Sequence, residues 1–174
     1  EVLIFDYRGY GLSEGSPEEA GLYQDARAAM DYLLKEREIE PQRIVIFGRS
    51  LGGALASRLA ADHPVKGLIL ESAFTSAADM GAEIYPFYPA RLLTRLNYPT
   101  RADLQRVRAP VLIIHSRDDE IVSFAHSQRL LEAAPGKSSF LELRGGHNDG
   151  FLVSREAYQA GLEGFLADLE DRAP

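Results

Sequence analysis

A serine flanked by glycines is the strongest chemical signal in the sequence. Ser50 lies in a Gly-x-Ser-x-Gly pattern at residues 48–52, between a predicted strand, Arg43–Phe47, and a predicted helix, Leu51–Ala61. A nucleophile elbow requires this context, because glycines are needed where a Cβ would strike the neighbouring strand or helix. At the helix start, the backbone N–H of Leu51 can stabilise a developing oxyanion. We predict that Ser50 is a nucleophile; a glycine-rich turn without chemistry is the alternative.

A serine hydroxyl is a weak nucleophile unless a nearby base removes its proton, and histidine commonly serves as that base. Of the four histidines, His147 lies in the glycine-rich loop 144–150, just beyond the last predicted strand. Folds with parallel strands place their sites in such loops. We interpret His63 as a helix C-terminal cap, His115 as a packed core residue and His126 as part of a surface helix. His147 is therefore the predicted base; a surface loop histidine is the alternative.

An acidic cluster follows another predicted strand. Asp118, Asp119 and Glu120 come directly after Val111–His115. A carboxylate beside the base would fix its tautomer and stabilise the imidazolium formed during turnover, and the chain order serine, acid, histidine is a known order for such triads. Spacing alone does not choose among the three acids, and a solvated turn accounts for two of them.

Short apolar runs alternate with stretches of helical periodicity, which is typical of an α/β fold with a mostly parallel sheet flanked by helices. The predicted strands are nearly uniform apolar runs, as expected of strands buried on both faces. They are Val2–Tyr7, Arg43–Phe47, Gly67–Leu70, Val111–His115 and Ser139–Leu143. The predicted helices are one that begins at Ser16 and Pro17, Leu51–Ala61, about Phe124–Ala134, and Ser154–Leu169.

One interval interrupts this alternation. Residues 80–98 are rich in aromatic residues and proline, and we interpret them as a small cap or lid within a single domain of residues 1–174. Its rings would line an acyl or aromatic pocket. Aromatic side chains that merely cover the sheet are an equal alternative.

Composition excludes several classes of function. The net charge of −7 opposes nucleic-acid binding, which depends on Lys and Arg that neutralise phosphates. The chain has no cysteine, so disulfides, a thiol nucleophile and zinc–thiolate sites are excluded. No apolar run approaches the roughly 18 residues that span a bilayer, and no secretory leader is present. A cytoplasmic location is the default expectation, and the predicted chemistry requires neither metal nor organic cofactor.

Together these segments resemble the α/β-hydrolase superfamily, and within it the Bem46-like serine hydrolases. The segments that carry the resemblance are Phe5–Gly15, Phe47–Ala54, Leu70–Ser76, His115–Val122 and Gly145–Asp149. They cover nearly the whole chain in the family's order. In the family pattern His-Gly-x-x-Asp-x-x-Val the acid falls on Asp119, with Asp118 as the fallback, and Ser116 replaces the usual glycine.

The resemblance also implies parts that this sequence lacks. The family's first three strands are absent, and the chain starts at Glu1 within an apolar run, so we expect that upstream residues were removed. Val2–Tyr7 must then pair with Arg43–Phe47 or with a second copy that completes the sheet as a homo-oligomer. The absent part would include the loop that supplies a second oxyanion donor, so only the Leu51 N–H is encoded. Losing one such donor costs on the order of a hundredfold to a thousandfold in rate.

The resemblance and the residues together predict a serine hydrolase acting on small-molecule substrates. Ser50 would attack the acyl carbon of a carboxylic ester or thioester, His147 would transfer the proton, and Asp119 would orient His147. Amide or peptide cleavage by the same triad is the nearest variant. The rival from another class is a non-catalytic hydrolase-like fragment or binding protein.

Overall fold

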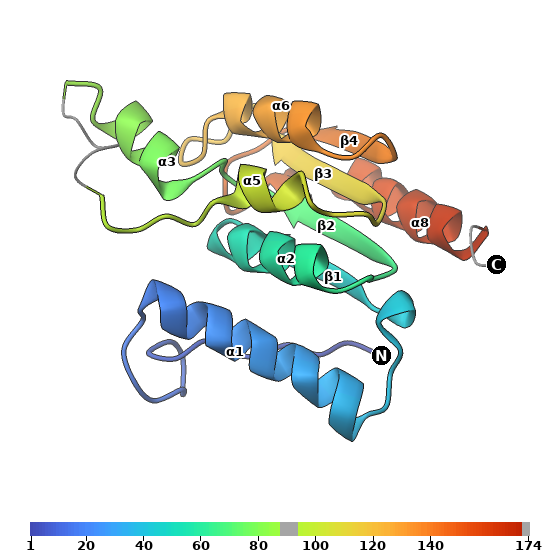
Figure 1. Cartoon of the computed structure of the whole chain (residues 1–174). Coiled ribbons are helices and arrows are strands. Elements are labelled where there is room, and N and C mark those ends of the chain that lie inside the picture. The colour runs from blue at the N-terminus through green and yellow to red at the C-terminus, as the bar shows by residue number, and fades with distance from the viewer. Residues whose placement is uncertain (88–93, 172–174) are drawn as a thin grey trace.

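The protein is built around a parallel four-stranded sheet with the strand order β1-β2-β3-β4 (Figure 1). The computed structural model describes residues 1–87 and 94–171. Neighbouring strands pair in parallel throughout, with Phe47 opposite Ile69 and Ile69 opposite Leu112. The predicted parallel α/β sheet is thus confirmed for the last four predicted strands. Their observed bounds are β1 Val45–Arg49, β2 Gly67–Glu71, β3 Val111–Ser116 and β4 Ser138–Leu143.

Helices separate these strands, and the predicted helices agree with the observed ones to within one or two residues, except at the first helix. The helices Ala77–Ile84, Thr100–Leu104 and Gly150–Val153 were not predicted. Ser16 does not cap that helix, which begins at Glu19 with Glu18 at the N-cap. A π-helical turn, Tyr32–Glu36, continues α1, and a 3₁₀ turn, Pro41–Arg43, precedes β1. The α-helices are α1 Glu19–Asp31, α2 Leu51–Asp62, α3 Ala77–Ile84, α5 Thr100–Leu104, α6 Phe124–Ala133, α7 Gly150–Val153 and α8 Arg155–Asp171.

The two faces of the sheet are covered by different helices (Figure 1). Side chains alternate between the faces of a strand, so Leu68 and Leu70 of β2 pack in one cluster while Ile69 packs in another. The first cluster is closed by apolar residues of α2, α5 and α6, and the second by Phe165 and Leu169 of α8. Burial on both faces explains why β2 and β3 read as uniform apolar runs.

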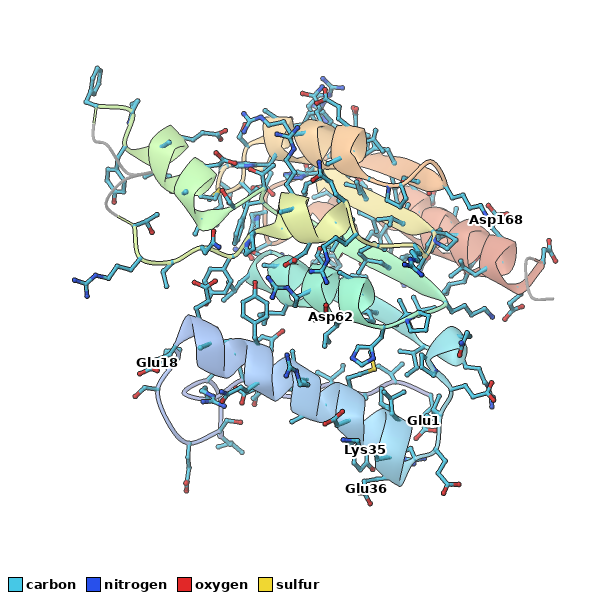
Figure 2. All side chains as sticks on the ribbon, in the orientation of Figure 1. Glu1, Glu18, Lys35, Glu36, Asp62 and Asp168 are labelled. Atoms are coloured by element: carbon cyan, nitrogen blue, oxygen red, sulfur yellow. The ribbon has the colours of Figure 1, made fainter. Side chains whose placement is uncertain are left out.

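A third cluster holds α1 against α2. Leu22 and Ala26 of α1 are buried with Ala54 and Leu55 of α2. Charged side chains such as Glu18 and Asp168 point outward (Figure 2). None of the helices in residues 1–87 and 94–171 has the length and apolar character needed to cross a membrane.

The predicted strand Val2–Tyr7 is wrong. This segment forms no strand and runs alongside α1 (Figure 1), with Val2 and Ile4 83% and 86% exposed. A strand exists only through hydrogen bonds to a neighbour, and β1 pairs with β2 and with no second strand among the described residues. A groove of about 1320 Å³ lies between this segment and β1.

The predicted cap interval, residues 80–98, is only partly described. Its first residues belong to α3, which lies beyond the carboxyl ends of the strands (Figure 1). Residues 88–93 lie outside the described residues, so the cap or lid remains a prediction.

The open edge of β1 predicts self-association, because an unpaired edge and the half-exposed Phe47 beside it favour strand addition from a second copy. We expect sedimentation velocity to show concentration-dependent association, and expect Phe47→Lys to shift the protein towards monomer. Leu152→Lys, at an exposed leucine outside this edge, is the control. A monomer at all concentrations would contradict the prediction.

Candidate active site

Ser50 lies in a strained turn between β1 and α2. Its φ of 50° and ψ of −120° are unusual for a residue with a side chain. The turn requires glycine at position 48, because a Cβ there would come 2.4 Å from the Gly52 carbonyl oxygen of α2. The Ser50 N–H donates to the Glu71 carbonyl oxygen at 2.9 Å, which ties the turn to β2.

The structure brings together the three side chains for which the sequence predicts a shared chemistry. His147 Nε2 lies 3.2 Å from Ser50 Oγ, and His147 Nδ1 lies 2.8 Å from Asp119 Oδ2. Ser50 follows β1, Asp119 follows β3 and His147 follows β4, so all three lie at the carboxyl edge of the sheet. Ser50 and Leu51 also line the groove beside β1. As the first residue of α2, Leu51 has an N–H with no partner within the helix.

The side chain of Asp119 is buried, and backbone groups fix its carboxylate. Its Oδ1 accepts hydrogen bonds from the N–H of Ile121 at 2.9 Å and of Val122 at 2.8 Å. His115 Nε2 lies 3.3 Å from Oδ2, the same oxygen that faces His147.

These contacts keep Asp119 ionised. Burial alone raises the pKa of its carboxyl group. Hydrogen bonds from His115, the backbone and His147 outweigh burial and hold the pKa well below its usual value. Asp119 is therefore an anion at the pH of any ordinary assay.

The neighbouring acids have other partners. Asp118 forms an ion pair with Arg144 at 2.8 Å and accepts the Gly145 N–H at 3.3 Å, so it contacts the start of the histidine loop but not the imidazole. Glu120 Oε2 accepts the backbone N–H of His147 at 2.9 Å. Among the three adjacent acids, Asp119 is the one whose carboxylate contacts the His147 imidazole, a choice that spacing alone had left open.

The other histidines follow the sequence interpretation except at His126. His63 occupies the C-cap of α2, and His115 is fully buried at the end of β3. The prediction of a surface position for His126 is wrong, because it is fully buried in α6. Its Nδ1 accepts the N–H of Thr75 at 3.1 Å. Because Thr75 is far from α6 in the sequence, the helical periodicity around His126 could not predict this contact. Within the described residues, no cluster of His, Asp and Glu could hold a metal ion.

Two supporting residues had no sequence signal. Arg49 donates to the His147 carbonyl oxygen at 2.5 Å, and Glu120 holds the N–H of the same residue. Arg49 occupies the variable position of the Gly-x-Ser-x-Gly pattern, and Glu120 is one of three adjacent acids. Only the folded arrangement assigns each of them a partner.

A family model described as the alpha/beta hydrolase fold matches residues 1–97. The chain belongs to the α/β-hydrolase fold family. The Bem46-like resemblance within that family agrees with protein bem46 of Schizosaccharomyces pombe, which is 38% identical over 127 residues. That alignment covers 70% of this chain and 42% of the yeast protein.

Two further comparisons cover nearly all of the chain. An uncharacterized protein of Mycobacterium tuberculosis is 42% identical over 168 residues, which are 96% of this chain and 60% of that protein. A crystal structure of an alpha-beta hydrolase from Vibrio vulnificus superposes with a TM-score of 0.74 at 25% identity, covering 93% of this chain and 61% of that one. The chain thus spans less than two thirds of each relative.

The turn geometry predicts that Gly48→Ala destabilises the protein. The new Cβ would come 2.5 Å from the Ala56 Cβ as well as meeting the Gly52 carbonyl, and such overpacking costs about 1–3 kcal/mol. Gly164→Ala is the matched control, since a Cβ there meets nothing within 4 Å. Urea unfolding should show a loss for the first variant and none for the second; equal effects would contradict the prediction.

The lowered pKa of Asp119 predicts a pH-dependent contribution to stability. That contribution is fully present above the unfolded pKa of about 3.9 and is lost as the pH falls through the lower folded value. We expect Asp119→Asn to reduce the free energy of unfolding at pH 7 by about 1–3 kcal/mol. Urea unfolding between pH 7 and pH 3.5 should show the difference between variant and wild type shrinking below about pH 4. A difference that grows towards acid would contradict this sign.

Proposed function

We propose that this chain is a serine hydrolase that cleaves carboxylic esters or thioesters through an acyl-enzyme intermediate. The observation that carries the proposal is the continuous contact from Asp119 through His147 to Ser50, with gaps of 2.8 Å and 3.2 Å. Both distances are within reach of hydrogen bonds in a triad without bound substrate.

The proposed reaction follows from which atoms face one another. His147 Nε2 accepts the Ser50 hydroxyl proton as Oγ attacks the acyl carbon, and the same proton then passes to the leaving alkoxide or thiolate. Water, deprotonated by Nε2, attacks the acyl-enzyme, releases the acid and restores Ser50. Asp119 holds Nδ1–H throughout and stabilises the imidazolium, which is consistent with its lowered pKa.

The N-terminus of α2 supports the negative charge that develops on the substrate. The Leu51 N–H adjoins the nucleophile, and the α2 dipole has its positive end at the same point. Ser50 opens into the groove beside β1, which provides room for an acyl group. The family relationship favours hydrolase chemistry, and esters or thioesters place the smallest demand on leaving-group protonation. Amide cleavage by the same residues is the nearest alternative.

Labelling with a fluorophosphonate probe tests the proposal. We expect the wild-type chain to be labelled, and Ser50→Ala and His147→Ala to abolish labelling because one lacks the nucleophile and the other the base. Asp119→Asn should slow labelling by on the order of a thousandfold or more, since asparagine favours the wrong imidazole tautomer. Asp118→Asn, the adjacent acid without a contact to the imidazole, should have little effect.

Two outcomes would contradict the proposal. A chain that is folded by circular dichroism but unlabelled would favour a non-catalytic hydrolase-like protein. Labelling that survives Ser50→Ala would place the nucleophile elsewhere. For a labelled chain, matched 4-nitrophenyl esters and 4-nitroanilides should then show faster turnover of the esters; faster turnover of the anilides would favour amide cleavage.

A further inference from the structure

Arg49 links the nucleophile turn to the histidine loop. It is the residue directly before Ser50, and its Nη2 donates to the His147 carbonyl oxygen at 2.5 Å and to Asn148 Oδ1 at 3.3 Å. Its guanidinium also lies over the Phe151 ring, 5.9 Å from the centroid. One side chain thus contacts several points of the loop that carries the base.

A buried carboxylate holds Arg49 in this orientation. Glu71, at the end of β2, is 4% exposed, and its Oε1 lies 3.2 Å from Arg49 Nε. Its Oε2 accepts the Tyr158 hydroxyl of α8 at 2.7 Å. The pKa of Tyr158 is raised, mainly by burial and secondly by this hydrogen bond. The tyrosine therefore remains a neutral donor. The contact with Arg49 is an ion pair without hydrogen-bond geometry at Nε. Because a buried carboxylate needs a countercharge, Glu71 nevertheless constrains the guanidinium beside it.

We propose that Arg49, oriented by Glu71 and Tyr158, is a positioning residue that sets the distance between His147 and Ser50. It acts through the backbone of His147 and touches no reacting atom. The inference rests on the proposed hydrolase function for its catalytic consequence, while its structural consequence can be measured independently.

The backbone of His147 is held from both sides. Glu120 accepts its N–H at 2.9 Å and Arg49 donates to its carbonyl oxygen. Two charged side chains thus clamp the backbone of His147, whose imidazole is the proposed base. Loss of one clamp leaves the Asp119 contact intact but frees the loop to move relative to Ser50. Misplacement of a catalytic group by about 1 Å costs roughly a hundredfold in rate.

Arginine suits this role better than lysine. The contacts to Glu71 and to His147 leave from different nitrogens of one planar group, Nε and Nη2. A lysine ammonium is a single point and cannot reproduce this fork. Arg49→Lys should therefore keep the charge but restore the positioning only in part.

The experiment compares Arg49→Gln and Arg49→Lys with a matched control, Arg58→Gln. Arg58 pairs with buried Asp103 at 2.8 Å and is exposed to nearly the same extent as Arg49, 36% against 35%, but it contacts α5 and not the histidine loop. Removing either arginine disturbs a buried carboxylate, so both Gln variants should lose thermal stability. Only the Arg49 variants should loosen the loop.

The readouts separate positioning from stability. In Arg49→Gln we expect faster amide hydrogen exchange within residues 145–150, and a maximal fluorophosphonate labelling rate lowered by roughly tenfold to a hundredfold. The probe concentration for half-maximal labelling rate should change little, and Arg49→Lys should fall between Gln and wild type. Arg58→Gln should leave exchange in the loop and the labelling rate unchanged.

Unchanged exchange in residues 145–150 of Arg49→Gln would overturn the proposal, as would equal effects of the Arg49 and Arg58 variants on labelling. If the wild-type chain is not labelled, the proposed function fails. Loop exchange then still decides whether Arg49 positions His147.

Discussion

The strained turn at Ser50 is the constraint on which the rest of the site depends. Its positive φ is maintained because Gly48 allows β1 and α2 to approach within contact distance and because the Ser50 N–H is bound to β2. The same turn orients the Ser50 side chain and places the N-terminus of α2 beside it. The proposed nucleophile and its proposed oxyanion donor therefore come from one local structure, and the remaining groups must be brought to it.

The parallel sheet brings them because all its strands end at the same edge. Loops after β3 and β4 carry Asp119 and His147 to the turn that follows β1. Proximity alone would not keep the Asp119 carboxyl group ionised, since burial disfavours its charged form. Backbone hydrogen bonds and two imidazoles offset that penalty at Asp119, so a buried carboxylate stays ionised beside His147. The clamp from Arg49 and Glu120 acts on the same loop through backbone atoms.

Two errors of the sequence interpretation have the same physical origin. Val2–Tyr7 has the composition of a buried strand, but strand formation depends on a neighbour, and none pairs with this segment among the described residues. His126 has the sequence context of an exposed helix, but it is buried in the core, where its Nδ1 accepts the N–H of Thr75. The helix start was misplaced for a milder reason: Ser16 and Pro17 favour a helix N-terminus, yet α1 begins where Leu22 can pack on α2.

The sequence by itself determined the last four strands, the helices α2, α6 and α8, the glycine-flanked turn at Ser50 and the residue types of the candidate triad. These depend on local periodicity, on glycine at close contacts and on motifs of neighbouring residues. Local spacing left open which acid faces the His147 imidazole, and only the family resemblance favoured Asp119 before the structure placed it there. Tertiary structure alone decided that Arg49 and Glu120 hold the His147 backbone. Those contacts join residues 27 to 98 positions apart. Their distances are set by how strands, helices and loops pack, and no local pattern encodes that packing.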